Sequence, residues 1–400
     1  MSRRTKIIIV VVVVLLLVVL GVFLYFLFKK QPLPSDGGGT FPPPTGEVTP
    51  KEEPPTVLPP EAPKAFEPIL RQLSKVPIAG SVLGSKSGEA TARYQERAAG
   101  NVYEIGAAGE GERRVTNTTI PKVYEALWNR AGTALIARYV RDNTETIESF
   151  SARISPGTSG KEGELQGTFL PRSIADAALS PDGTLLFYLQ EENGGAVGIR
   201  SDLSGKGKTK LWASPVREWL VAWPTANKIM LLSKPSNLAS GMLLSLDPTT
   251  SASTLILRNI PGLTALMNPV RPQVLYSASG ESNFSLFLLD LATGKRSAVQ
   301  TTTLPEKCAW NKKGDRLYCG VPKSISPGSY PDVWYQGIIG FEDEVWSFTP
   351  ATGVTEHILD ISEKRGTAID LVRPEVSPDE KFLLFTDKES GTLWSLQMKE

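Results

Sequence analysis

The two cysteines, Cys308 and Cys319, are the residues whose type and spacing most directly suggest chemistry. They flank one short apolar hairpin. If Trp310 faces Leu317 across its turn, the two cysteines also face each other, with Cα atoms about 4.5–5.5 Å apart, a separation that suits a disulfide. We predict a Cys308–Cys319 disulfide, which an oxidising compartment would allow to form. Two unpaired buried thiols that fill the hairpin are the alternative.

The residues needed for common catalytic sets are missing from the sequence. His357 is the only histidine, on an apparent outer strand at 355–359, and we interpret it as a surface residue. One histidine and two cysteines do not make a tetrahedral zinc set, and neither a Gly-x-Ser-x-Gly motif nor a phosphate-binding glycine loop occurs. We predict a non-catalytic chain with no metal and no cofactor. A glycosidase-like carboxylate pair inside a channel is the alternative.

A second candidate group is rich in aromatic side chains and lies within six positions. It consists of Tyr330, Asp332, Trp334 and Tyr335. Exposed tryptophan and tyrosine are frequent hot spots of protein interfaces, and their rings also stack on sugars or peptides. We predict that these four residues contact a protein or glycan partner.

A repeat from Val76 to Glu400 must position these residues. Its anchor positions are 128, 180, 223, 268, 310 and 377, at spacings of 52, 43, 45, 42 and 67 residues. In each unit an apolar strand ends in Trp or Ser, a turn follows, and further apolar strands come next. Four short strands per unit are typical of one propeller blade. The anchor residues Trp128, Trp223 and Trp310 are predicted to lie in blade cores.

These units predict an all-β, seven-bladed β-propeller at 66–400, rather than one with six or eight blades. A further unit precedes the six anchors, since Gly84 lies 44 residues before Trp128. The last unit ends after its third strand, at 392–397. We predict that residues 69–74 supply its outer strand, because joining the two ends in one blade removes a free edge and closes the ring.

The spacing of 67 residues places about twenty extra residues in the sixth blade, at 321–341, between its second and third strands. Long loops in compact domains are usually functional or disordered, and this one is rich in aromatics. The sequence allows two interpretations of this insert. The insert either plugs the channel with its aromatic side chains or presents them to a partner.

The N-terminal segments predict membrane attachment. Residues 7–28 are an uncharged apolar run of 22 residues, which as a helix would span about 33 Å, close to one hydrocarbon core. Residues 1–6 are predicted to be cytoplasmic, because Arg3, Arg4 and Lys6 favour the inner side. Residues 29–65 follow as a disordered linker, with eleven prolines between 31 and 65. The chain is therefore predicted to be a single-pass membrane protein whose propeller lies on the extracytoplasmic side.

The turns Ser180-Pro181-Asp182-Gly183 and Ser377-Pro378-Asp379 lie between apolar strands. They resemble the signature of the TolB-type, WD-repeat-like propeller repeat, and the resemblance covers residues 76–400. Together with the anchor and the linker, it implies a protein of the bacterial cell envelope. The repeat implies a fold, and that fold serves many different ligands.

Composition narrows the class of partner. The formal net charge is +1, and no block of Lys or Arg occurs beyond the flanks of the apolar run, so we expect no nucleic acid partner. We predict a protein- or glycan-binding scaffolding module that engages an envelope component. The alternative is an envelope hydrolase or lyase with its site in the channel.

Overall fold

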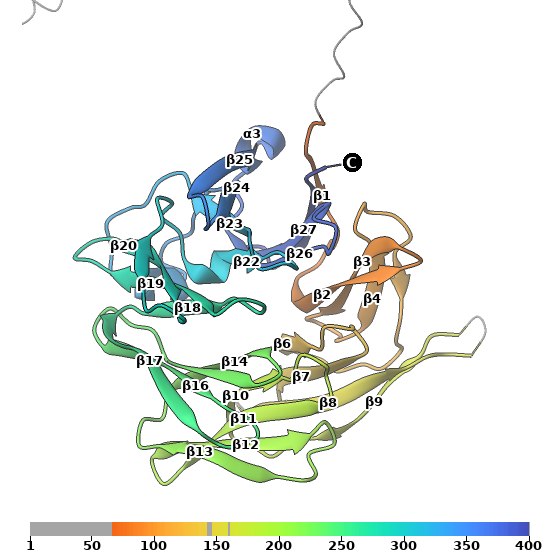
Figure 1. The fold of residues 1–400 in the computed structure, drawn as a ribbon. Coiled ribbons are helices and arrows are strands. Elements are labelled where there is room, and N and C mark those ends of the chain that lie inside the picture. The colour runs from red at the N-terminus through yellow and green to blue at the C-terminus, as the bar shows by residue number, and fades with distance from the viewer. Residues whose placement is uncertain (1–65, 142–145, 159–160, 400) are drawn as a thin grey trace, which may run out of the picture. The chain divides into compact units, whose positions relative to one another are not determined.

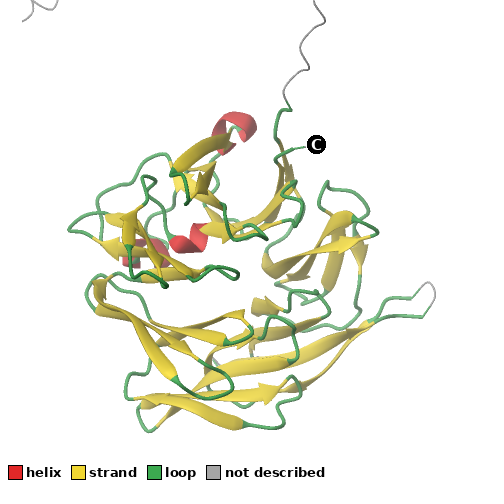
Figure 2. Cartoon of the chain, in the orientation of Figure 1, coloured by secondary structure: helices red, strands yellow, loops and turns green. Residues whose placement is uncertain are grey.

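The protein is described from a computed structural model, in which residues 66–141, 146–158 and 161–399 are placed. They form seven four-stranded antiparallel sheets arranged around a central channel (Figure 1). Strands and loops dominate, and helices are few and short (Figure 2). The predicted seven-bladed, all-β propeller is therefore confirmed.

Each blade is an antiparallel meander whose first strand lines the channel and whose last strand lies outermost. The first three blades comprise β2 (Ile78–Lys86), β3 (Glu89–Glu96), β4 (Val102–Gly106) and β5 (Arg113–Arg114); β6 (Val123–Trp128), β7 (Ala134–Val140), β8 (Ile147–Ser155) and β9 (Glu164–Phe169); and β10 (Ile174–Leu179), β11 (Leu185–Glu192), β12 (Gly195–Asp202) and β13 (Thr209–Ser214). The next three comprise β14 (Trp219–Thr225), β15 (Lys228–Ser233), β16 (Ser240–Leu246) and β17 (Ser253–Pro261); β18 (Thr264–Met267), β19 (Gln273–Ser279), β20 (Phe284–Asp290) and β21 (Arg296–Ala298); and β22 (Cys308–Trp310), β23 (Leu317–Pro322), β24 (Asp343–Thr349) and β25 (Val354–Asp360).

The seventh blade joins both ends of the described chain. Strands β26 (Leu371–Val376), β27 (Phe382–Asp387) and β28 (Leu393–Gln397) are completed by β1 (Ile69–Gln72), which pairs with β28 from Ile69 opposite Gln397. The Ser74 hydroxyl then accepts a hydrogen bond from the backbone N–H of Leu393, at 2.8 Å. The predicted closure of the ring by residues 69–74 is confirmed, because β1 covers the edge of β28 and becomes the outer strand of this blade.

One polar side chain organises the turn between the first and second strands of most blades. The Ser180 hydroxyl accepts from the backbone N–H groups of Thr184 and Leu185, at 3.2 and 2.9 Å. The carbonyl oxygen of Asn311 accepts in the same way from two turn N–H groups, at 3.0 and 3.1 Å. Asn129 and Asn268 also accept from two backbone N–H groups each, and the Ser377 hydroxyl accepts from that of Phe382. The repeated Ser and Asn are therefore structural, because they satisfy turn donors that would otherwise be buried without a partner.

The cysteines and the anchor tryptophans lie where the repeat predicts. Cys308 and Cys319 are directly opposite in the β22–β23 pair and form a disulfide. Trp223 and Trp310 are buried, and the half-buried Trp128 packs against an apolar cluster between blades. The predicted disulfide and the core position of Trp223 and Trp310 are confirmed, whereas Trp128 is only partly buried.

Three short helical segments complete the described part. They are η1 (Pro305–Lys307), α2 (Asp332–Tyr335) and α3 (Ile361–Arg365). No helix among the described residues is both long and apolar enough to cross a membrane. The apolar run at 7–28 and the linker at 29–65 lie outside those residues, and their predicted roles remain predictions.

Candidate binding surfaces and channel

The insert between β23 and β24 folds back onto the propeller and is fixed by a buried ionic group. The indole N–H of Trp334 donates to a carboxylate oxygen of Asp370, at 2.7 Å. Asp370 also accepts from the ammonium of Lys307, whose nitrogen lies 2.6 Å from an oxygen of Asp343. We call these four residues the latch. It connects the insert to the end of η1, to the start of β24 and to the residue that precedes β26.

Two carboxylates share one ammonium inside the latch. The side chains of Lys307 and Asp343 are fully buried, and burial raises the pKa of Asp343 to about 6 although Lys307 opposes the rise. The Lys307 ammonium also lies 5.4 Å from the ring centre of Trp334 and 5.1 Å from that of Phe341. Removing either partner of such a buried ion pair strongly destabilises the folded protein, because the remaining charge has no water to solvate it.

The aromatic residues of the insert are part of a core. Tyr330 and Trp334 are 0% and 2% exposed and pack with Phe284, Leu304 and Phe341. This placement differs from the expectation that both rings face a partner. Their side chains gain more by burial against loops of the fifth blade than they would in water. The insert does fold back on the protein, but its aromatic side chains pack against neighbouring loops and do not line the channel cavity, so the predicted plug is wrong.

The other two predicted partner residues lie nearer the surface. A carboxylate oxygen of Asp332, which is half-buried, accepts from the backbone N–H of Asn237 at 2.7 Å, so the insert also reaches the fourth blade. Tyr335 is 40% exposed, and its hydroxyl donates to the buried carboxylate of Glu306. Burial raises the pKa of Glu306, and burial together with the Glu306 charge raises the pKa of Tyr335. Tyr335 thus presents part of its ring from a fixed position.

Two further apolar side chains are exposed beside α2. Leu238, next to Asn237, is 90% exposed, and Ile338 is 68% exposed. The backbone N–H of Ile338 donates to the carbonyl of Val333, which holds this loop against α2. We call Leu238, Tyr335 and Ile338 the insert patch. Sequence reasoning missed Leu238 and Ile338, because a single leucine or isoleucine in a loop gives no signal of its exposure.

The central channel contains a cavity of about 800 Å³ to which the first strands of all seven blades contribute. Most of its wall and rim is apolar, with Trp128, Trp223, Trp310 and Met267 among the lining residues. Within the described part of the chain, none of the lining residues comes from the insert. The insert therefore covers loops of the disc without filling this cavity.

The charged groups of the channel are largely balanced. Glu125 accepts from Arg138 at 2.7 Å and lies 3.8 Å from Arg373. Glu375 accepts from the backbone N–H of Leu83 at 2.9 Å, and burial raises its pKa to about 7. The channel therefore has one carboxyl group that can hold a proton near neutral pH. No acidic cluster converges on the mouth among the residues that line the cavity.

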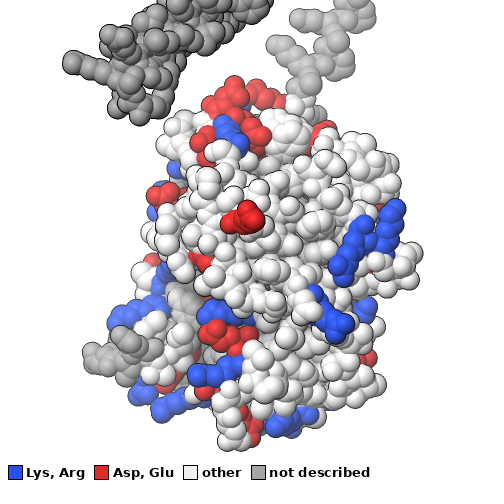
Figure 3. Space-filling view, turned by 90° about the vertical axis from the view of Figure 1, so that its left-hand side faces the viewer, with Lys and Arg blue, Asp and Glu red and all other residues white. Residues whose placement is uncertain are grey.

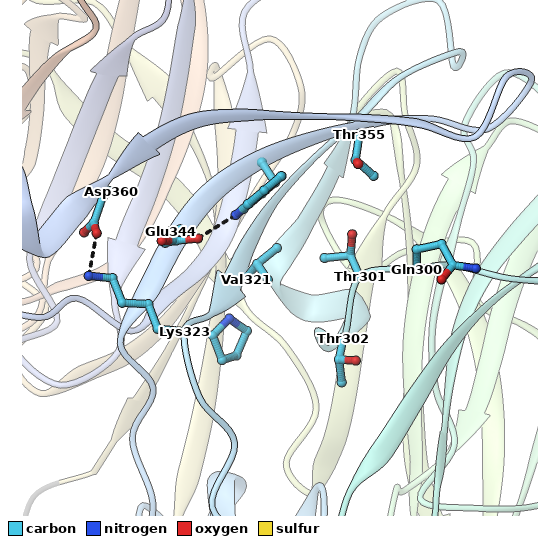
Figure 4. A pocket seen from close by; sticks show the side chains of 10 residues that line it. Gln300, Thr301, Thr302, Val321, Lys323, Glu344, Thr355 and Asp360 are labelled. Carbon is cyan, nitrogen blue, oxygen red and sulfur yellow. Dashed lines mark hydrogen bonds and ion pairs between the residues drawn. The ribbon is translucent and has the colours of Figure 1, made fainter. Parts of the chain in front are cut away.

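A third surface is a groove of about 570 Å³ between the fifth and sixth blades. Gln300, Thr301 and Thr302 lie on one side of it, and Lys323, Glu344 and Asp360 lie on the opposite side (Figure 4). The groove is also lined by Val321, Pro322, Trp346 and Thr355. His357 lies on the outer strand β25 beside the groove and is 44% exposed, so its predicted surface position is confirmed.

Comparison with known proteins supports the fold and nothing finer. No family model and no curated protein matches the sequence. The β-propeller domain of Cps50 (Swd1) from Myceliophteria thermophila is similar to this chain at a TM-score of 0.50 and 11% identity, over 83% of this chain and 100% of that one. TolB from Acinetobacter baumannii gives a TM-score of 0.42 at 11% identity, over 76% and 61%. An oligogalacturonate lyase in complex with manganese gives 0.47 at 11% identity, over 84% and 99%. At such identities a likeness shows the fold alone. The chain is a seven-bladed β-propeller, and its structural neighbours include propellers of the TolB and WD-repeat type.

Proposed function

We propose that this protein is a membrane-anchored, non-catalytic binding module that engages a protein partner through the insert patch. The observation that carries the proposal is the exposure of Leu238, Tyr335 and Ile338 beside α2. Soluble domains rarely leave neighbouring large apolar side chains exposed unless another surface covers them.

The support beneath the patch favours recognition of a partner. The latch and the buried aromatic core fix α2 against three blades, so little conformational entropy is lost when a partner binds. Tyr335 is anchored by Glu306 yet exposes part of its ring, which is the environment of many interface hot spots. All three side chains of the patch are uncharged, so we propose that the partner presents an apolar surface.

The N-terminal sequence and the disulfide support the proposed location. The apolar run at 7–28 and the proline-rich segment at 29–65 suit a membrane anchor and a spacer. The Cys308–Cys319 disulfide suits an oxidising compartment. We therefore propose that the propeller is displayed on the extracytoplasmic side of the membrane, where its partner is a component of the cell envelope.

Photocrosslinking in intact cells tests the proposal. Ile338 is replaced by p-benzoylphenylalanine, and a matched probe replaces Phe169, which is exposed on β9 of the second blade. We expect one discrete crosslinked protein from position 338 and none from position 169. Adding Leu238→Asp to the 338 probe should abolish the crosslink, since a charge in the contact must be desolvated. Equal labelling from both positions, or a crosslink insensitive to Leu238→Asp, would contradict the proposal.

A second candidate function rests on Glu375. A carboxyl group with its pKa raised to about 7, at the wall of a cavity of about 800 Å³, can act as a general acid at neutral pH. This candidate is an envelope hydrolase or lyase acting in the channel. Its test is the release of reducing ends from neutral and acidic polysaccharides by the full chain, compared with Glu375→Gln and with the exposed control Glu218→Gln. Release that disappears only in Glu375→Gln would support an enzyme, and absence of release from every substrate would remove the candidate.

A further inference from the structure

The groove between the fifth and sixth blades exists because the fifth blade is short at its outer edge. Its outermost strand β21 has only three residues, whereas β25 of the sixth blade has seven. The face of the sixth blade is therefore not fully covered there, and Glu344 and Trp346 of β24 line an open groove together with Thr355 of β25. The groove volume of about 570 Å³ is within the usual range of small-molecule sites.

Trp346 supplies an aromatic wall whose polar atom is already used. Its indole N–H donates to a carboxylate oxygen of Glu344 at 2.9 Å. The imidazole of His357 meets the indole edge-on, with the ring centres 5.0 Å apart at an angle of 67°. These contacts fix the ring orientation. Because its N–H is occupied, Trp346 offers the groove an apolar ring surface and no free donor.

Several polar side chains of the groove have no hydrogen-bond partner among the residues that the structure describes. The side chains of Gln300, Thr301, Thr302 and Thr355 make no hydrogen bond to any described residue. Together they supply three hydroxyl groups and one amide, all able to donate and to accept. They lie around the groove with Trp346, so a ligand can contact an apolar ring and several neutral hydrogen-bonding groups at once.

The charges of the groove disfavour an anionic ligand. Lys323 lies 2.6 Å from Asp360 and 3.0 Å from Glu342, so its charge is already neutralised. Glu344 adds a further carboxylate to the lining. The neighbouring side of the body, where β19 and β20 lie, is also largely free of charged side chains (Figure 3). A phosphate or a uronic acid would meet carboxylates here without a free cation to bind it.

We propose that this groove is a binding subsite for a neutral sugar ring of a glycan. A pyranose has an apolar face of C–H groups, which stacks on an aromatic ring, and hydroxyl groups at its edge, which pair with amides, hydroxyls and carboxylates. The groove offers both kinds of contact, through Trp346 on one hand and Gln300, Thr301 and Thr302 on the other. The site is separate from the insert patch, so it goes beyond the proposed function and does not depend on it.

The test uses the full chain in lipid nanodiscs, labelled with 5-fluorotryptophan. The sequence has eight tryptophans, and the fluorine signal that is absent from Trp346→Phe belongs to Trp346. The probes are cellotetraose and tetra-N-acetylchitotetraose, with tetragalacturonate as an anionic control and a proline-rich peptide as a protein-like control. We expect at least one neutral tetrasaccharide to shift the Trp346 signal in a saturable way, and neither control to do so.

Calorimetric titration of the same sugar then assigns the polar contacts. Gln300→Ala and Thr302→Val should each weaken binding about three- to tenfold, because each removes one neutral hydrogen bond. Thr168→Val, a threonine on the outer strand of the second blade, should leave binding unchanged. The proposal is overturned if neither neutral sugar shifts the Trp346 signal, if tetragalacturonate or the peptide binds more tightly, or if Thr168→Val weakens binding as much as Thr302→Val.

Discussion

The repeat turns and the insert are held by opposite means. In a repeat turn, a neutral side chain such as Asn311 satisfies backbone donors four and five residues further along the chain. In the insert, the latch joins Lys307, Asp343 and Asp370, which are far apart in the sequence and carry charge. The turn is stabilised by residues close in the sequence, and the same arrangement recurs in most blades. The latch is a tertiary contact of the sixth blade and depends on neighbouring blades.

The turn hydrogen bonds and the latch differ in how much stability is lost when they are removed and in which part of the protein they fix. A neutral turn hydrogen bond contributes about 1 kcal/mol, and removing it leaves the rest of the blade intact. A buried ion pair contributes little net stability compared with an apolar substitute, yet breaking it is expensive. We infer that the latch serves mainly to hold α2 and the insert patch in one position.

The largest effect is expected from breaking the latch. Lys307→Met leaves Asp343 and Asp370 buried without a cation, and we expect a loss of about 3–5 kcal/mol in the free energy of unfolding, measured with denaturant. The control is Lys364→Ala, which removes an ion pair with Glu67 at the surface and should cost less than about 1 kcal/mol.

A compensated variant sharpens this result. Lys307→Met combined with Asp343→Asn and Asp370→Asn removes all three charges, and it should recover much of the lost stability because no unpaired charge remains. Equal destabilisation in the single and the triple variant would show that packing, and not charge, dominates the latch.

The next largest effect is expected from the disulfide, a covalent form of local closure. Cys308→Ala with Cys319→Ala opens a loop whose ends are 11 residues apart, and the loop-entropy argument gives a loss of about 2–3 kcal/mol. Denaturant titration of the oxidised protein and of the variant measures the difference. Reduction of the wild-type disulfide should reproduce the loss, and a variant as stable as the oxidised wild type would contradict it.

The features that could be predicted from the sequence are local ones and those that follow from the repeat. The blade count, the closure by residues 69–74 and the disulfide all follow from a repeat period or from a hairpin register. Each of these depends on residues that are close in the chain or on a pattern that recurs. The predicted core position of Trp223 and Trp310 follows from the same periodicity.

Features that depend on contacts between distant, non-repeating segments could not be predicted from the sequence. Composition shows that the insert is aromatic, but only the fold brings Trp334 to Asp370 and so determines that the ring is buried. Leu238 belongs to a loop of the fourth blade, and only the fold brings this loop to α2, through the hydrogen bond between Asn237 and Asp332. The groove between the fifth and sixth blades depends on the shortness of β21, which leaves part of β24 uncovered. None of these contacts recurs along the chain, so the sequence repeat gives no sign of them.

The pH dependence of stability compares buried carboxyl groups in both kinds of region. Burial raises the pKa of Glu375 to about 7 and those of Asp176 and Asp343 to about 6. Between these values and their unfolded values near 4, the folded state holds protons that the unfolded state releases. Stability should therefore increase as the pH falls from about 7.5 to 5.5. Asp360, whose pKa the hydrogen bond from Lys323 lowers to about 2, acts in the opposite direction only below about pH 4.

One substitution isolates the channel contribution to this dependence. Glu375→Gln removes the carboxyl group of the channel whose pKa is raised to about 7, and it should reduce the gain in stability between pH 7.5 and 5.5 by about 2 kcal/mol. Melting curves at the two pH values measure it. The matched control is Glu218→Gln on the surface, and a pH dependence unchanged in Glu375→Gln would contradict the assignment.

The smallest effect is expected at a single repeat turn, and it tests whether the local solution is transferable. Asn311→Ala leaves the backbone N–H groups of Asp315 and Arg316 without their acceptor and should cost about 1–2 kcal/mol. Asn311→Ser should recover part of that loss, because serine accepts from equivalent N–H groups in the turns after Ser180 and Ser377. Recovery would show that the turn needs only an acceptor at this position. If serine were as destabilising as alanine, the further hydrogen bonds of the Asn311 amide, to Asp315 at 2.8 Å and to Glu380 at 3.2 Å, would be what holds this turn against the seventh blade. In that case the turn would be a tertiary contact like the latch.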